Sequence, residues 1–310
     1  VTPPCPYAGP ALCGGCDLQH VRLPAQRDLK AQVVREQLVR IAGLDPGDPL
    51  LTGLVVEAVP GDLPENDEGL RWRTRMQYVA LPGGTRGLRE HRSRNVVEID
   101  DCRIAHPGAR EVGGPGEQPP VEETVVTSRG TRTFAVEADG FWQVHPGAPR
   151  VLVETVLAML DPRSGERARE RDAGGGRGAG FLSEAVGESA RVVAVEGDRA
   201  AVRHAVRNLA DREKVEVAEG SVDRVLASAY DEPFDLVVLD PPREGAKRTV
   251  VEQVVDRAPC AVAYVACDPA ALARDVAIFA EHGYRLSELR GLDLFPMTHH
   301  VECVALLTRT

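Results

Sequence analysis

The 310-residue sequence predicts a doubly wound α/β domain preceded by a smaller α+β domain. From about residue 150, strand-length apolar runs alternate with helix-length segments, which is typical of a largely parallel sheet covered by helices. Before residue 150, short strand-like segments are separated by turn residues and follow a start rich in Cys, Gly and Pro. The chain is long enough for two domains with a substantial core.

Composition sets limits on the class of protein. The chain is 43% hydrophobic and 27% charged, as in ordinary globular proteins. It contains no run of about 18 apolar residues that would span a membrane, and no signal peptide. A formal net charge of −10 argues against a general nucleic-acid binder. Residues 71–103, however, carry eight arginines against four acidic residues, which suits either a phosphate-binding surface or a solvated sheet face.

The elements of the first half follow from periodicity and turn residues. Residues 1–20 are expected to form a metal-binding loop, and residues 26–44 a helix that ends near Gly43. Residues 52–104 alternate like strands, and residues 113–120 form a linker or loop. Three more strands are expected at residues 123–127, 131–137 and 141–145.

The second half alternates more regularly. Helices are expected at "PRVLVETVLAML", "RAAVRHAVRNLADR", "KRTVVEQVVDRA" and "DPAALARDVAIFAEHG". Strands are expected at "RVVAVEGD", "FDLVVLDPPR", "AVAYVAC", "YRLSELRGLDLFP" and "HHVECVALLTR". Ligands of such sheets bind at the carboxyl ends of the strands.

Three of these strands end in residues suited to chemistry. Glu196 is placed to bind a ribose hydroxyl pair, or is a surface acid at a strand end. Asp240 is followed by two prolines, which fix a rigid loop at the sheet edge. Cys267 lies between an apolar strand and a helix, where the helix dipole is expected to favour its thiolate. The alternative is an inert, buried cysteine.

The sequence resembles a known family, the S-adenosylmethionine-dependent RNA 5-methyluridine methyltransferases. The resemblance covers nearly the whole chain and rests on five motifs in the family's order: "CGGCDLQH", "FWQVHPGA", "LDPPREG", "VACDPAALARD" and "HHVECVALL". It implies a Rossmann-like doubly wound methyltransferase domain at residues 138–310, a central α+β domain at 21–137 that contacts RNA, and a cysteine cluster loop at 1–20. It also implies a monomeric, cytoplasmic enzyme that has no contact with membranes.

By this resemblance the enzyme transfers a methyl group from S-adenosylmethionine to C5 of a uridine in RNA. Cys267 is the nucleophile that adds to C6 of the base, and Glu302 is the base that removes the C5 proton. Ribosomal RNA is favoured over transfer RNA. The methyl donor is expected to contact six residues: Gln143, Asp172, Gly176, Gly178, Glu196 and Asp240. His145 occupies the family's usual Asn position.

The cysteines suggest a metal cofactor. Seven cysteines without a secretory signal argue against a disulfide framework. Cys5, Cys13 and Cys16 have the spacing C-x7-C-x2-C, two residues longer than the family's first interval, with Cys102 as the distant fourth ligand. Four thiolates suit a [4Fe–4S] cluster. Zinc also accepts four cysteines, and the absence of any metal is the third reading.

The glycine-rich loop departs from the family. The spacing of Asp172, Gly176 and Gly178 is kept, but residues 167–171, "RARER", replace an apolar central strand. Buried, unpaired charges are costly. Three explanations stay open: a distorted strand with weak donor binding, a local reading-frame error, or a non-catalytic metal-stabilised RNA-binding protein that has lost donor binding. Relatives often carry a small RNA-binding module before the cluster loop, whereas this chain starts at that loop.

Overall fold

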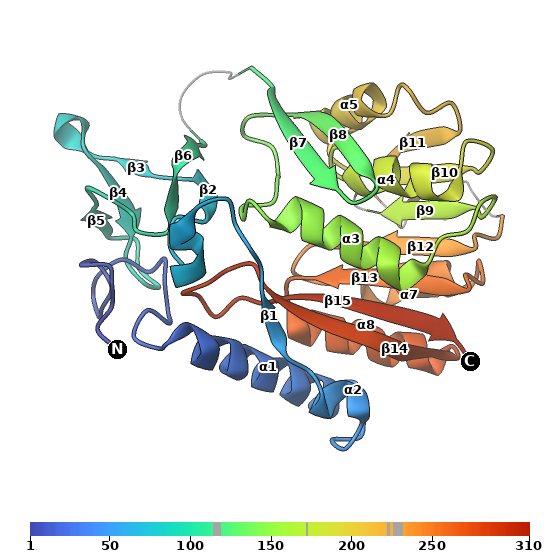
Figure 1. Ribbon diagram of the computed structural model, residues 1–310, viewed down its shortest axis with the longest axis horizontal. Helices are drawn as coiled ribbons and strands as arrows, with labels where there is room; N and C mark the ends of the chain where they lie inside the picture. Colours follow the sequence, from blue (N-terminus) through green and yellow to red (C-terminus); the bar gives the residue numbers. More distant parts are fainter. Residues whose placement is uncertain (114–118, 172, 222–223, 226–231) are drawn as a thin grey trace.

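An eight-stranded sheet forms the centre of the computed structural model, which describes all residues except 114–118, 172, 222–223 and 226–231 (Figure 1). The strand order is β1-β14-β15-β13-β12-β9-β10-β11. Only β15 runs antiparallel to its neighbours. The strands are β1 (Val56–Ala58), β9 (Ala168–Arg171), β10 (Val192–Glu196), β11 (Val215–Glu219), β12 (Leu236–Leu239), β13 (Ala261–Ala266), β14 (Tyr284–Asp293) and β15 (Glu302–Arg309).

Helices cover both faces of this sheet, as the alternating pattern predicts. Side chains along β13 point alternately to the two faces, so Val262 and Tyr264 join one hydrophobic core and Ala263 and Val265 the other. The first core includes α1 (Leu23–Arg40), α2 (Pro49–Thr52), α7 (Lys247–Val255) and α8 (Pro269–Glu281). The second includes α3 (Ala148–Leu160), α4 (Arg177–Val186), α5 (Arg199–Asn208) and the hairpin of β7 (Val121–Thr127) with β8 (Gly130–Val136). None of the described helices is long and apolar enough to cross a membrane.

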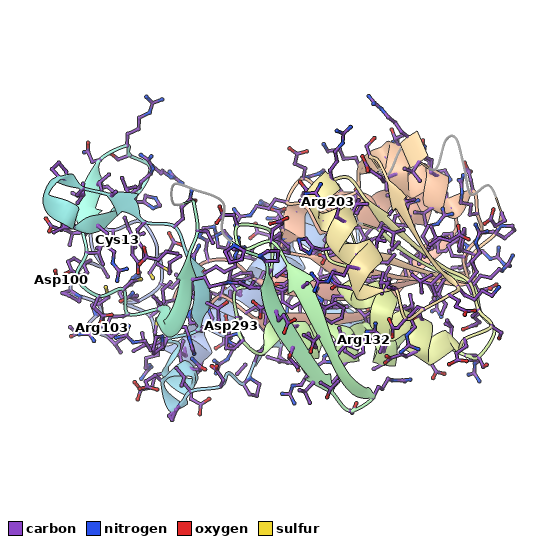
Figure 2. All side chains as sticks on the ribbon, turned by 90° about the horizontal axis from the view of Figure 1, so that it is seen from above. Cys13, Asp100, Arg103, Arg132, Arg203 and Asp293 are labelled. Atoms are coloured by element: carbon purple, nitrogen blue, oxygen red, sulfur yellow. The ribbon has the colours of Figure 1, made fainter. Side chains whose placement is uncertain are left out.

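A smaller lobe holds the cysteine-rich start of the chain. Its strands form two small sheets, one of β2 with β6 and one of β3, β4 and β5. Their bounds are β2 (Arg73–Met76), β3 (Val79–Ala80), β4 (Arg86–Arg89), β5 (Val96–Glu98) and β6 (Ala105–Glu111), with short 3-10 turns at Pro64–Glu68 and Pro82–Gly84. Cys13, Asp100 and Arg103 all lie in this lobe, apart from Arg132 and Arg203 over the large sheet (Figure 2).

Two segments lie elsewhere than the sequence predicts. Residues 23–58, expected in the central domain, pack onto the large sheet: β1 pairs with β14, and α1 contacts α8. The reason is an apolar stripe on α1, where Ala31, Val34 and Leu38 are buried in the sheet core. The strand expected at residues 141–145 does not form. This segment is instead an irregular connection that leads into α3.

The charged segment "RARER" nevertheless forms a central strand. β9 lies between β12 and β10, and Arg169, Glu170 and Arg171 are all buried. Arg169 places its guanidinium 3.8 Å from the ring centre of Phe234, a cation–π contact. Glu170 points to the opposite face, where it meets α4. Backbone pairing on both sides therefore keeps the strand in place despite its charged side chains.

Candidate active site

The two residues expected to carry the chemistry lie at one edge of the sheet. Ala266, the last residue of β13, pairs with Cys303 on β15. Continuing this antiparallel register by one residue sets Cys267 opposite Glu302. Glu302 is also paired with Leu292 on β14, and its side chain is buried. The topology thus brings together two residues that lie 35 positions apart in the sequence.

The protonation of Cys267 differs from the prediction. Burial, together with the nearby carboxylate of Glu302, raises the pKa of the Cys267 thiol to about 11. A backbone hydrogen bond at Cys267 lowers the pKa, in the direction expected of a helix N-terminus, but burial outweighs it. Asp268 caps α8 instead, because its carboxylate accepts a hydrogen bond from the Ala271 amide at 2.7 Å. The free site thus holds a neutral thiol at pH 7.

Asp240 and Glu302 form an acidic pair beside this thiol. Burial raises the pKa of Glu302 well above its usual range, and the charge of Asp240 raises it further. Burial likewise raises the pKa of Asp240 to about 6. Arg177 opposes both shifts, and its guanidinium lies 3.7 Å from the Asp240 carboxylate. Arg243 also favours the Glu302 carboxylate and contacts His300 at 3.5 Å.

Glu170 is a site residue that the sequence motifs did not single out. It is the last but one residue of β9 and lies near the first turn of α4, where its carboxylate accepts a hydrogen bond from the Ala179 amide at 2.6 Å. A Cβ on Gly178 would lie 1.9 Å from the same carboxylate, so any larger residue there would force the Glu170 side chain to move. Burial raises the pKa of Glu170 to about 8. The one available signal was its place at the carboxyl end of a charged central strand.

The other residues expected to bind the donor are placed as follows. Gly176 caps α4 in the left-handed region, with φ of 82°. Glu196 ends β10 and accepts hydrogen bonds from the amides of Gly174 and Asp198, each at 2.7 Å. Gln143 is buried in the connection before α3. Asp172 lies outside the described residues.

His145 lies in the same connection as Gln143 and is also buried. Its Nδ1 accepts a hydrogen bond from the Gly147 amide at 3.1 Å, and its ring stacks on Trp72. Burial lowers the pKa of His145 to about 4, so the imidazole is neutral at pH 7. In this arrangement His145 holds the turn into α3.

A small cavity lies where β9, β12, β13, α3 and α4 meet. Its volume is about 30 Å³. Its polar lining comes from Glu170, Arg177, Gly178 and Asp240, and its apolar lining includes Val156 and Phe181. The cavity is therefore lined by two residues expected to bind the donor, Gly178 and Asp240. It is also lined by Glu170 and Arg177, which the sequence motifs did not single out. Gln143, Glu196, Cys267 and Glu302 do not line it.

The four cysteines expected to bind a metal line one cavity of the small lobe. Cys5, Cys13, Cys16 and Cys102 all contribute to its wall, and its volume is about 260 Å³. Burial raises the pKa of the thiols of Cys13 and Cys102, and that of Cys16 to about 12, and each is raised further by neighbouring cysteines. Within the described residues, no group of three or more His, Cys, Asp or Glu side chains is close enough to hold a single metal ion.

The arginine-rich segment is divided between ion pairs and solvent. Arg71 binds the Asp101 carboxylate through two bonds of 2.6 and 2.7 Å, and Arg86 pairs with Glu111. The hairpin of β4 and β5 instead exposes three arginines: Arg89, Arg92 and Arg94. This hairpin packs on the cysteine loop, where the Gly14 amide donates to the Arg89 carbonyl at 3.0 Å.

The cysteine loop is also bonded to the segment between β14 and β15, which leads to Glu302. The Leu18 amide donates to the Met297 carbonyl at 2.9 Å, and Asp17 lies 2.6 Å from the His299 ring. Gln26 on α1 donates to the Leu18 carbonyl and accepts from the Met297 amide. The cysteine loop, the first helix and the segment that leads to Glu302 are thus joined by hydrogen bonds.

Comparison with known proteins places this arrangement in a family. Residues 223–310 match the family model described as tRNA (Uracil-5-)-methyltransferase. A protein of Streptomyces avermitilis named as an RNA methyltransferase is 41% identical over 99% of this chain and 83% of its own length. A 23S rRNA (uracil(1939)-C(5))-methyltransferase of Pseudomonas fluorescens is 29% identical over 97% of this chain and 79% of its own length.

A solved structure shares the fold. The Pyrococcus abyssi tRNA (uracil-54, C5)-methyltransferase, in complex with S-adenosyl-L-homocysteine, superposes with a TM-score of 0.69 and 21% identity, covering 95% of this chain and 86% of that one. The predicted Rossmann-like α/β methyltransferase fold is thereby confirmed. The resemblance seen in the five motifs is confirmed as well, and the chain belongs to the family of RNA methyltransferases that includes the uracil-C5 enzymes.

Proposed function

We propose that this protein transfers the methyl group of S-adenosylmethionine to C5 of a uridine in RNA. The observation that carries the proposal is the strand register that sets Cys267 opposite Glu302, with Asp240 close enough to shift the pKa of both. Ribosomal RNA is favoured because several sequence relatives are named as 23S rRNA enzymes. The target base must leave its stack to reach this edge.

The reaction needs a nucleophile because C5 of uracil is itself too weak to attack the donor. Cys267 gives its proton to solvent and its sulfur adds to C6, while the C5=C6 double bond opens towards the C4 carbonyl oxygen as an enolate, which makes C5 nucleophilic. C5 then takes the methyl group, and S-adenosylhomocysteine leaves. Glu302 accepts the C5 proton, the C6–S bond breaks and Cys267 is released. Arg243 favours the carboxylate form of Glu302 that this last step requires.

The cysteine cavity supports a [4Fe–4S] cluster held by Cys5, Cys13, Cys16 and Cys102. All four cysteines line one cavity, and four Cys ligands are what such a cluster requires. Zinc, which also accepts four cysteines, stays the alternative. When bound, the cluster would fix the loop on which the arginine hairpin and the Met297 segment pack.

A second function is favoured by one observation. A cavity of about 30 Å³ is far smaller than the roughly 300 Å³ or more of ordinary ligand pockets. This supports a non-catalytic, metal-stabilised RNA-binding protein as the alternative. Such a protein would use the exposed arginines of the β4–β5 hairpin and would need no methyl donor.

The deciding experiment uses RNA transcripts in which uridine is replaced by 5-fluorouridine. Fluorine at C5 cannot leave as a proton, so the covalent intermediate persists. With methyl-labelled S-adenosylmethionine, we expect a denaturation-stable, labelled adduct with the wild type and with Cys260→Ser, an exposed cysteine at the start of β13. We expect none with Cys267→Ser. An adduct that survives Cys267→Ser, or RNA binding with no adduct at all, would overturn the assignment.

A further inference from the structure

The cavity beside Asp240 is too small for the donor that the proposed function requires. Its volume of about 30 Å³ is far below the roughly 300 Å³ or more of ordinary ligand pockets. The walls from β9, β12, β13, α3 and α4 are buried and packed, so they cannot retreat cheaply. One wall residue differs, because Arg177 contributes a long, flexible side chain. Arg177 is thus the polar wall residue whose movement would enlarge this cavity most readily.

Arg177 is held at the site by weak contacts. It is the first residue of α4 and follows Gly176, whose positive φ turns the chain into the helix. Its guanidinium lies 3.7 Å from Asp240, longer than the 2.6 to 2.9 Å of the well-formed ion pairs elsewhere in the chain. Its other partner is the face of Trp142, 5.7 Å away. The side chain remains 15% exposed, so it has a route outward to solvent.

The same guanidinium balances a cluster of acids. Glu170, Asp240 and Glu302 all lie at this edge of the sheet, and the positive charge of Arg177 acts on each of them. S-adenosylmethionine is itself a cation at its sulfonium sulfur. A sulfonium beside Asp240 and the Arg177 guanidinium would occupy the same region and repel each other, since buried like charges are unfavourable.

We propose that Arg177 stands in for the cationic methyl donor, closes the donor site in the free protein and must swing out before the donor enters. This inference rests on the proposed function, because it takes S-adenosylmethionine as the ligand. It makes Arg177 a residue that sets donor affinity and discriminates between the donor and its product, which lacks the sulfonium charge.

Calorimetric titration with two ligands tests the proposal. S-adenosylmethionine carries the sulfonium charge, and S-adenosylhomocysteine has a neutral thioether in its place. Arg177→Met keeps most of the side-chain length but removes the charge. We expect it to lower the Kd for S-adenosylmethionine at least tenfold and to change the Kd for S-adenosylhomocysteine clearly less. Arg177→Lys, which restores a cation, should bind the donor like the wild type.

The matched control is Arg199→Met. Arg199 is the first residue of α5, the next helix, and its exposed side chain pairs with Glu219. It should leave both dissociation constants unchanged. Equal gains for the two ligands, or weaker donor binding by Arg177→Met, would overturn the proposal while leaving the proposed function intact. If no variant binds either ligand, both the proposal and the proposed function fail.

Discussion

At the scale of single residues, burial in the candidate site disfavours the ionised side chains that the proposed reaction requires. In the proposed reaction Cys267 becomes a thiolate and Glu302 a carboxylate, yet burial raises the pKa of both groups. Each charged form also disfavours the other, because the two side chains are close. The free protein therefore disfavours the charged form of both groups.

Methylation should therefore accelerate steadily with pH. The pKa of the Cys267 thiol is about 11, so its thiolate fraction rises about tenfold per unit through the range below that value. Deprotonation of Glu302 acts in the same direction. We expect log kcat/KM for RNA to increase with pH from 6.5 to 9.5, measured by methyl incorporation with RNA binding followed in parallel. A profile that is flat from pH 6.5 upward would contradict a thiol nucleophile of this kind.

Glu302→Gln should separate the two halves of the reaction. Methyl transfer from the donor needs Cys267, whereas loss of the C5 proton needs a base, so the variant should accumulate the methylated covalent adduct on ordinary RNA. Gel mobility under denaturing conditions checks this, with Cys267→Ser as the blank. Free methylated RNA released at the wild-type rate would show that another group removes the proton.

Strand ends in the sequence singled out Asp240 and Cys267, and the resemblance singled out Glu302. The fold brings the three to one edge of the sheet. Sequence motifs could not find Glu170 or Arg177. In a run such as "RARER", neither periodicity nor spacing shows which charge reaches a pocket and which packs on an aromatic ring. That assignment depends on the strand register, which fixes the face of Glu170 through its pairing with Ala194 and Val238.

At the scale of elements, β9 shows what a charged central strand costs. The pKa of Glu170 is raised to about 8 in the folded state, against about 4.5 for an ordinary glutamate. A raised folded pKa means that this group's contribution to stability is complete below pH 4.5 and is lost as the pH rises to 8. The contribution of Glu170 to the stability of the fold is thus greatest at acidic pH.

Glu170→Gln should remove that dependence. Glutamine can still accept the hydrogen bond of the Ala179 amide but cannot ionise. Urea unfolding at pH 5.5 and 8.5 should show that the wild type loses more stability with rising pH than the variant, by an amount on the order of a few kcal/mol. Glu188→Gln, at an exposed position after α4, should follow the wild type. The same pH dependence of stability in all three proteins would contradict the raised pKa assigned to Glu170.

The loop between β12 and α7 is held in place by one buried acid, Asp275. Asp275 on α8 accepts hydrogen bonds from the amides of Ala246 and Lys247 and from the Tyr264 hydroxyl. It also lies 2.7 Å from where a Cβ on Gly245 would be, so the loop closes tightly over it. This contact fixes the far end of the segment that begins at Asp240.

Asp275→Asn should loosen this loop. The asparagine amide would face donors at a buried position, which should destabilise the fold by about 1–3 kcal/mol. The rate of methylation should fall further than donor binding does, because Asp240 and Arg243 lose their fixed placement. Tyr264→Phe, which removes only one of the three donors, should have a smaller effect on both. An equal loss for the two variants would mean that the loop amides contribute nothing.

At the scale of the whole molecule, alternation of strands and helices predicted the large sheet and its two cores. It could not predict that residues 23–58 join that sheet, because β1 is only three residues long and its partner, β14, lies more than 200 positions away. The cavity of four cysteines could be anticipated from their spacing, whereas its bonds to the Met297 segment could not. Contacts between distant segments depend on the closed fold.

One buried ion pair shows how strongly the two ends of the chain depend on each other. Lys30 on α1 binds Asp293 at 2.6 Å and the Phe295 carbonyl at 3.0 Å, and both charged side chains are almost fully buried. The pair anchors the segment that runs from β14 to Glu302. The first helix therefore supports the catalytic edge across 263 positions of sequence.

Lys30→Met should destabilise the protein by about 3–5 kcal/mol, because it leaves the Asp293 carboxylate buried without its partner. Adding Asp293→Asn removes the stranded charge and should recover much of the loss, which a double-mutant cycle by urea unfolding measures. Arg40→Met breaks an exposed pair with Glu36 on the same helix and should cost only about 0.3–0.5 kcal/mol. If Lys30→Met destabilised the protein as little as Arg40→Met, the buried ion pair would not anchor the segment that leads to Glu302. The expected loss, accompanied by weaker methylation in the surviving folded fraction, would make α1 part of the support for Glu302.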